Sequence, residues 1–352
     1  MNYKETLFFV AKCLTISSNK KNRIEVKKTI EKNSIDWDTI VKISTSHFVF
    51  PALYQNLKFV NFLKFLPEDL VNYMEHITEL NRERNLAILA QVKEVNSELL
   101  KHNIVPIFLK GASFIVEELY NDISERMIGD IDFIVDDNEF KETILILEKY
   151  GYKSKTNETG NVFPYVHYPK MTRNNHIAAV EVHRKIMNNK FSKFYIYDFF
   201  FNGKRSFDSV NVPSLKNQII HNCINKQIRD NGKYFKTISL RNSYDLLQLS
   251  LKQDPLKALI ENRVNFYDLN NYLASAYKIF KSDSLKYDEN KFSIKFINKV
   301  NLFLKYPFLS KIETYRFNLL INSRKRLPKF FKFITNKKYR PYYFRNFIHT
   351  KK

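Results

Sequence analysis

The stretch GDIDFIV at residues 129–135 constrains the fold of this chain most. Its apolar end is typical of a buried strand. In a strand the side chains at i and i+2 leave the same face, so Asp130 and Asp132 are expected to point the same way. Two carboxylates this close repel each other unless cations neutralise them. The stretch therefore predicts a strand that presents paired aspartates to divalent metal ions, as two-metal phosphoryl chemistry requires.

A third acidic ligand is expected on a neighbouring strand, and the sequence VEVH at residues 180–183 fits this role. The two valines indicate an extended segment, in which His183 shares the face of Glu181. Glu181 is the candidate third metal ligand and the general base for an acceptor hydroxyl, with His183 as a supporting residue. The alternative is a glutamate at the rim of the sheet, paired with Arg184 or Lys185.

The apolar run at residues 104–109 predicts another buried strand, which ends at Lys110 and Gly111. A glycine at a strand-to-helix turn lets the backbone approach a phosphate, and the following helix offers free N–H groups. Lys110, Gly111 and Ser113 are therefore candidate nucleotide-binding residues. The alternative is a structural turn with a solvated lysine.

Arg126 lies four residues before the first aspartate. It is a candidate to hold the acidic cluster in place or to bind a phosphate as a bidentate donor. A surface arginine is the competing interpretation. His221 and Asp245 are weaker candidates, because a histidine among apolar helix residues is more often a packing residue than a catalyst.

The hydrophobic pattern predicts an α+β fold. Apolar residues between 70 and 99 recur every three or four positions, as on the buried stripe of a long helix. Asn81 and Arg84 interrupt that stripe, which leaves a kink or a break open. After residue 104 the order is strand, helix, strand, helix, then extended stretches at 162–168 and 177–186. This order suits a small mixed sheet with helices on one side.

Helices return from Pro213, and Asn242 or Ser243 is expected to cap one of them. The expected divisions of the chain are an N-terminal helical region, a core with the mixed sheet, a C-terminal helical region and a basic, aromatic-rich tail, at residues 1–103, 104–205, 206–304 and 305–352.

The net charge of +22 is unevenly spread. Residues 305–352 hold 14 Lys or Arg against one acid, Glu313, which gives 14 − 1 = +13 in that segment. Such a field attracts RNA, DNA or an anionic membrane face. The tail also mixes aromatic residues with cations in FFKF at 330–333 and YYFR at 342–345, which suits nucleobase stacking or a membrane interface. The alternatives are a compositional bias towards lysine and a basic helix that folds over the helical region.

Cys13 and Cys223 form neither a zinc spacing nor a disulfide framework, so a reducing cytoplasm is expected. No apolar run approaches the roughly 18–20 residues that a membrane-spanning helix needs. The start of the chain predicts an ordinary helix, because its apolar run is short and Lys12 interrupts it. A location in the cytoplasm is expected, with peripheral contact at the inner face of the membrane as an option for the tail.

Together these motifs resemble the uncharacterised bacterial nucleotidyltransferase family of the DNA polymerase β-like superfamily. The resemblance rests on the order LKG-x-S, Tyr120, R-x-x-GDIDFIV and EVH, and extends over about residues 25–260. It implies a magnesium-binding triad of Asp130, Asp132 and Glu181, with Gly111 and Ser113 in a nucleotide-facing turn. The chain departs from the family pattern where Ala112 follows Gly111, with the serine one place later.

The resemblance implies a Mg²⁺-dependent enzyme that transfers a nucleoside monophosphate from an NTP to a hydroxyl acceptor and releases pyrophosphate. Acceptors consistent with the sequence are RNA, a carbohydrate or lipid-linked precursor of envelope polysaccharide, and a protein side chain. The alternative is a non-catalytic nucleotide- or RNA-binding protein that retains the fold.

Overall fold

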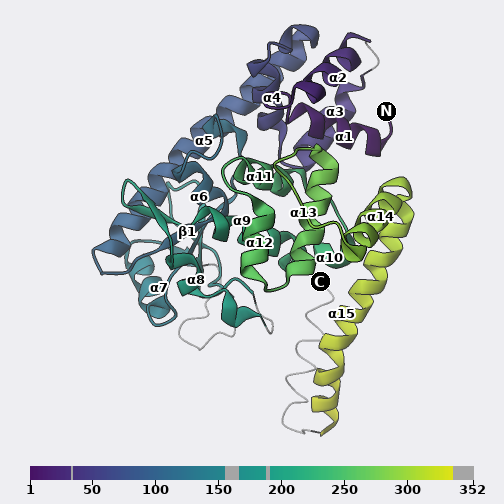
Figure 1. The fold of residues 1–352 in the computed structure, drawn as a ribbon. Helices are drawn as coiled ribbons and strands as arrows, with labels where there is room; N and C mark the ends of the chain where they lie inside the picture. The colour runs from purple at the N-terminus through teal and green to yellow at the C-terminus, as the bar shows by residue number, and fades with distance from the viewer. Residues whose placement is uncertain (33–34, 155–165, 188–190, 336–352) are drawn as a thin grey trace.

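The computed structural model describes residues 1–32, 35–154, 166–187 and 191–335 (Figure 1). The chain begins with helices whose ends are set by local side-chain caps. Asn2 forms a capping box with Glu5 at the start of the first helix, and this region was predicted to be helical. The elements of this region are α1 (Tyr3–Cys13), α2 (Lys20–Glu31), α3 (Trp37–Ser46), α4 (Phe50–Phe59) and the 3-10 turn η1 (Leu63–Phe65).

The long helix α5 (Glu68–Leu100) follows, and it runs past both the N-terminal helices and the sheet (Figure 1). It begins directly after Pro67 and carries two acids in its first turn, as the helix dipole favours. The polar residues in its apolar stripe do not break it. Instead, the side-chain amides of Asn81 and Asn85 bond to backbone carbonyls of residues 123–126. The predicted stripe is therefore confirmed, without the break that the sequence left open.

The described residues contain a seven-stranded mixed sheet in the order β3-β4-β5-β2-β1-β7-β6. In the centre, β2 pairs in parallel with β5 and antiparallel with β1. This arrangement confirms the predicted α+β class and both strands that carry the candidate acids. The strands are β1 (Ile107–Leu109), β2 (Asp130–Ile134), β3 (Lys153–Ser154), β4 (Met171–Thr172), β5 (Ala179–His183), β6 (Arg205–Phe207) and β7 (Val210–Val212).

Two parts of the sheet differ from the sequence-based expectation. The sheet continues through β6 and β7, a hairpin that the hydrophobic pattern did not predict, and β7 pairs in parallel with β1. The extended stretch expected at 162–168 lies mostly outside the described residues. Within it, His167 forms an isolated bridge with His183 of β5.

The two faces of the central strands have different partners. Phe108, Ile131 and Phe133 pack in one hydrophobic cluster with the second half of α5 and with α7 (Phe140–Lys149). Leu109 and Ile134 belong to a second cluster that includes the C-terminal helices. Because strand side chains alternate, Asp130 and Asp132 share the face of Ile134. The carboxylates therefore face the C-terminal helices.

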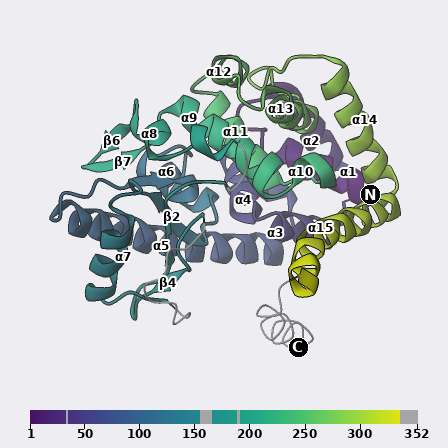
Figure 2. The same ribbon diagram turned by 90° about the horizontal axis from the view of Figure 1, so that it is seen from below.

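The C-terminal helices pack back against the N-terminal ones, where α1 contacts α13 and α14 (Figure 2). The helix that contains the predicted caps Asn242 and Ser243 begins earlier, at Leu240, because Ser239 accepts the backbone N–H of Asn242. The elements here are α8 (Tyr197–Phe201), α9 (Leu215–Ile224), the π-helical turn η4 (Asn225–Arg229), α10 (Gly232–Phe235), α11 (Leu240–Ser250), α12 (Pro255–Asn262), α13 (Phe266–Phe280) and α14 (Lys291–Lys305).

The basic tail starts as helix α15 (Pro307–Thr335), which extends away from the other helices (Figure 1). Its first part is fixed to the body of the protein. Phe317 stacks on Tyr234 of α10 with ring centroids 4.1 Å apart, and Glu313 pairs with Lys299 of α14 at 2.8 Å. The YYFR motif at 342–345 lies outside the described residues. Within the part of the chain that the structure describes, we find no helix with the length and apolarity to cross a membrane.

Candidate active site

Asp132 and Glu181 lie side by side on two adjacent strands in the centre of the sheet. They occupy paired positions of the parallel strands β2 and β5. Both are buried, with 7% and 8% of their surfaces exposed. Adjacent strands therefore bring two carboxylates, 49 residues apart in the sequence, to one point. This geometry excludes the alternative of Glu181 as a solvated residue at the rim.

His183 completes the cluster. It lies two positions after Glu181 on β5, so its side chain leaves the same face. Its Nε2 is 2.9 Å from Asp132 Oδ1 and 3.2 Å from Glu181 Oε2. The ligand atoms of these three residues lie within 4.8 Å of one another. A second histidine, His167, lies beside them with Nδ1 3.6 Å from Glu181 Oε1.

Lys110 brings a positive charge to this cluster. It stands at the start of α6 (Lys110–Val116), with its Nζ 2.5 Å from Asp132 Oδ1. Burial raises the pKa of Asp132, but the charge of Lys110 and the bond to His183 outweigh it and hold the pKa well below the usual value. Burial likewise opposes ionisation of Glu181, yet His183 keeps the pKa of Glu181 below its usual value. Both acids are therefore ionised at neutral pH.

Asp130 lies on β2 two residues before Asp132, and it is not one of the three residues of the cluster. Its carboxylate binds Lys170 Nζ at 2.5 Å, and a third of its side chain is exposed. The structure thus brings together two of the three predicted acids, with His183 as the third member of the cluster. The third predicted acid has a lysine partner on the same face of the sheet.

The predicted glycine turn has a different environment for each of its residues. Gly111 is buried in the first turn of α6, where an added Cβ would lie 3.0 Å from the side chain of Ile128. The hydroxyl of Ser113 is also buried and donates to the Lys110 carbonyl at 2.8 Å. Of the predicted phosphate-binding side chains in this turn, Lys110 is the one that points to the acids.

Arg126 is a buried residue that joins the core to the C-terminal helices. Its Nε and Nη2 donate to Asp245 of α11 at 2.7 and 3.0 Å. Tyr120 also donates to Asp245. The interpretation of Arg126 as a surface arginine is therefore wrong. The pair accounts for Asp245 as well, since its carboxylate neutralises the buried guanidinium.

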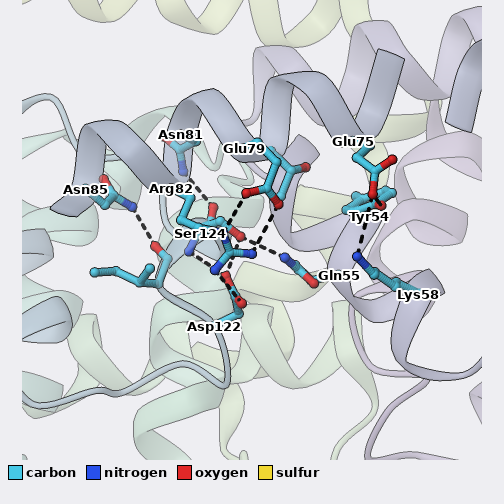
Figure 3. A network of polar contacts seen from close by, with 12 residues as sticks. Tyr54, Gln55, Lys58, Glu75, Glu79, Asn81, Arg82, Asn85, Asp122 and Ser124 are labelled. Carbon is cyan, nitrogen blue, oxygen red and sulfur yellow. Dashed lines mark hydrogen bonds and ion pairs between the residues drawn. The ribbon is translucent and has the colours of Figure 1, made fainter. Parts of the chain in front are cut away.

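The segment between α6 and β2 is held on α5 by a polar network (Figure 3). Asn81 Nδ2 donates to Ser124 O at 2.6 Å, and Asn85 Nδ2 donates to Ile123 O at 2.6 Å. Arg82 binds Asp122 at 2.8 Å, next to the 3-10 turn η2 (Ile123–Glu125). These contacts fix the backbone that leads into β2. The position of the aspartates therefore depends on the side chains of α5.

Metal-dependent transfer of phosphoryl groups uses carboxylates that converge on one point, and a nearby lysine can neutralise phosphate charge. A comparison with known families agrees with this chemistry, because the family model described as uncharacterised nucleotidyltransferase matches residues 33–281. The chain belongs to this nucleotidyltransferase family. It is therefore a transferase that uses a nucleotide substrate. No curated protein matches the chain.

Nucleotidyltransferases generally use a divalent metal, and the donor set of this nucleotidyltransferase fits one. Asp132 and Glu181 supply carboxylate oxygens, which Mg²⁺ and Mn²⁺ prefer, and His183 supplies an imidazole nitrogen. The cluster already has a cationic partner in the structure, because the ammonium group of Lys110 contacts Asp132. These residues are therefore able to hold a metal ion.

Sequence reasoning did not single out Lys170 or His167, which contact Asp130 and Glu181. Both residues come from the connection between α7 and β5. The sequence carried no local signal for them, because their partners are fixed by the pairing of β5 with β2.

Proposed function

We propose that this nucleotidyltransferase transfers a nucleoside monophosphate from an NTP to a hydroxyl acceptor with Mg²⁺ as cofactor and with release of pyrophosphate. The observation that carries the proposal is the juxtaposition of Asp132 and Glu181 on β2 and β5 beside Lys110. Asp130, on the same strand face, is the third acidic ligand. Bound metal would neutralise the charge on the transferred phosphoryl group.

Each residue of the site has a role in this reaction. Asp130, Asp132 and Glu181 would hold the metal, and Glu181 would accept the proton of the acceptor hydroxyl. His183 orients the two buried carboxylates through its Nε2. Lys110 would neutralise phosphate charge. Positioning and charge neutralisation supply most of the rate.

The remaining predicted nucleotide-binding residues act through the backbone or through a neighbour. Gly111 and Ser113 shape the first turn of α6, which carries Lys110. Arg126 fixes the segment before β2 through its pair with Asp245. We therefore propose Lys110 as the direct phosphate contact of this group.

The direct test incubates the full chain with Mg²⁺ and labelled NTPs and measures pyrophosphate release. We expect Asp132→Asn and Glu181→Gln to lower the rate at least about 100-fold, and Asp130→Ala to abolish transfer. Asp208→Asn, at an exposed aspartate outside the cluster, is the matched control and should keep the wild-type rate. Equal rates in the wild type and in Asp132→Asn would reject the proposal.

The charge of residues 305–352 indicates which class of acceptor the enzyme uses. A segment with 14 cations and one acid favours a polyanionic acceptor such as RNA, or an envelope-polysaccharide precursor on an anionic membrane face. A protein hydroxyl is the third class. Mass spectrometry of cellular RNA and proteins after expression of the wild type and of Asp132→Asn identifies the modified class. An RNA acceptor should bind more weakly as salt rises.

The second candidate function is binding of a nucleotide or RNA without turnover. The contact between Lys110 and Asp132 favours it to the extent that a lysine neutralises the carboxylate without metal. The intact pair of buried acids argues against it, because uncompensated buried carboxylates are costly. NTP binding in a titration, with no pyrophosphate released for any acceptor, would support this second function.

A further inference from the structure

A pocket next to the carboxylate cluster has residues to which the proposed function has given no role. It lies between α6 and the C-terminal elements α9, η4 and α11, and we call it the α9–α11 pocket. Lys110, which contacts Asp132, forms part of its wall, so the pocket lies next to the cluster. It encloses about 300 Å³, at the lower end of the range for small-molecule sites.

The cations of this pocket are not all neutralised. Lys110 is paired with Asp132, and Arg126 is paired with Asp245. Arg229 and Arg241 also line the pocket, and neither forms an ion pair with a carboxylate in the described part of the chain. Two arginines in one pocket without acidic partners indicate an anionic ligand.

Arg241 is the clearer case of a cation without an acidic partner. It is half-buried, and its Nε is a buried donor without a hydrogen-bond partner among the described residues. Its guanidinium stacks over Phe48, 4.8 Å from the ring centroid. Burial lowers the pKa of Arg241, and the charge of Arg126 lowers it further. A bound anion would compensate both effects.

Buried polar atoms without partners also gather here. Within the described residues twelve buried side-chain polar atoms have no hydrogen-bond partner, and five of them belong to residues that line this pocket: Gln218, His221, Asn222, Asn225 and Arg241. Buried polar groups are normally satisfied, so such a concentration indicates a polar ligand. The set includes amide oxygens, which accept hydrogen bonds from sugar hydroxyls or base amino groups.

The local backbone supports the same conclusion. Arg229 and Asn225 lie at the two ends of the π-helical turn η4, which continues α9. π-Helical turns are rare and occur frequently at functional sites. Gly232, just after the turn, approaches so closely that an added Cβ would lie 2.4 Å from the Lys226 carbonyl oxygen. The turn is therefore held in a specific shape, with Arg229 on the pocket.

We infer that the α9–α11 pocket binds the polyphosphate of the NTP, with Arg229 and Arg241 as the phosphate-binding residues that the C-terminal helices contribute. This inference rests on the proposed function, because it assigns the donor nucleotide of that reaction. Lys110 links the two parts of the site, since it reaches the pocket and Asp132. The amide oxygens of Asn222 and Asn225 then face the sugar or the base.

The two acids of the pocket are compatible with this ligand. Asp245 is neutralised by Arg126, and Asp230 is exposed to solvent. The charge that remains inside the pocket is that of Arg229 and Arg241.

The test measures binding of ATP and of inorganic tripolyphosphate to the full chain by calorimetry in the presence of Mg²⁺. We expect Arg229→Gln and Arg241→Gln each to weaken both ligands about 10- to 100-fold, since each removes charge-assisted hydrogen bonds. Arg241→Lys, which keeps the charge and loses the fork, should fall between the wild type and Arg241→Gln. Arg263→Gln, at an exposed arginine outside the pocket, is the matched control and should bind like the wild type.

Each alternative outcome has a separate meaning. Wild-type affinity for both ligands in Arg229→Gln and Arg241→Gln would overturn the inference, and so would the absence of binding to the wild type. Unchanged ATP affinity with a raised KM for a phosphorylated acceptor would also overturn it and assign the pocket to that acceptor. Weakened ATP binding in a protein that releases no pyrophosphate would uphold the inference and reject the proposed function.

Discussion

Asp132 and Glu181 lie at paired positions of two parallel strands, with the imidazole of His183 between their carboxylates. Parallel register places side chains of the same face next to each other, so the spacing of this pair is set by the sheet and not by a loop. The folded sheet therefore holds the two carboxylates close together before any ligand binds. A cation site formed by these residues would depend on the folded core.

The first prediction concerns metal binding and stability. Mg²⁺ or Mn²⁺ should raise the melting temperature of the wild type, because an ion that binds only the folded state stabilises it by about 2.7 kcal/mol at 100 times its Kd. Asp132→Asn and Glu181→Gln should lose most of this increase, which differential scanning fluorimetry measures. Asp208→Asn should keep it. The same increase in all four proteins would show that the ion binds elsewhere.

The second prediction concerns the buried pair of Arg126 and Asp245. Asp245→Asn leaves the guanidinium buried without a counter-charge, so the free energy of unfolding should fall by about 3–5 kcal/mol. Urea unfolding followed by circular dichroism measures the loss. The comparison is Asp208→Asn, which breaks the exposed pair with Lys93 and should cost no more than about 1 kcal/mol. Equal costs for the two variants would contradict a structural role for the buried pair.

The third prediction concerns the network between α5 and the segment that leads into β2. Asn81→Ala and Asn85→Ala each remove donors to buried carbonyls, so each should lower the free energy of unfolding by about 1–3 kcal/mol. Asn72→Ala, at an exposed position of the same helix, should change it by no more than about 0.5 kcal/mol. Urea unfolding of the three variants measures these changes in the free energy of unfolding. A loss at Asn72 equal to the other two would contradict a specific role for the network, because alanine favours a helix more than asparagine does.

The fourth prediction concerns pH. Burial raises the pKa of Glu125 to about 7 from an ordinary value of 4.5, although Tyr244 donates to its carboxylate at 2.9 Å. The folded state therefore binds this proton more tightly than the unfolded state. The contribution of Glu125 to stability is greatest below pH 4.5 and is lost as pH rises towards 7.

Glu125→Gln removes this titration, so the wild type should lose stability relative to the variant as pH rises from about 4.5 to about 7. Urea unfolding at several pH values measures the difference between the two proteins. Glu118→Gln, at an exposed glutamate of the same segment, serves as the control and should follow the wild-type curve. A constant difference between wild type and Glu125→Gln over the whole window would contradict the shifted pKa.

The strands that carry the acids could be predicted because their signals are local. The apolar run after Asp132 and the valines around Glu181 identify β2 and β5 from neighbouring residues alone. The alternation of side chains in a strand also places His183 on the face of Glu181 without knowledge of the fold. The stripe of α5 is equally local, since it depends on a period of 3.6 residues.

The partners of the site residues could not be predicted in the same way. Arg126 meets Asp245 from 119 residues away, and nothing near either residue indicates the other. The hairpin of β6 and β7 consists of strands of three residues, too short for a clear alternating pattern, and it is held by pairing with β1. Asn81 interrupted the predicted helical stripe because the carbonyls that its amide binds lie on another element.

The sequence by itself determined the α+β class and the strand faces of Asp130, Asp132, Glu181 and His183, because local periodicity sets which way a side chain points. Only the tertiary structure decided which of these groups meet. The pairing of β2 with β5 set Asp132 beside Glu181, and the return of the C-terminal helices brought Arg229 and Arg241 to a pocket that Lys110 shares. The physical reason is that contacts between distant segments depend on how whole faces bury their apolar surface, which no short stretch of sequence specifies.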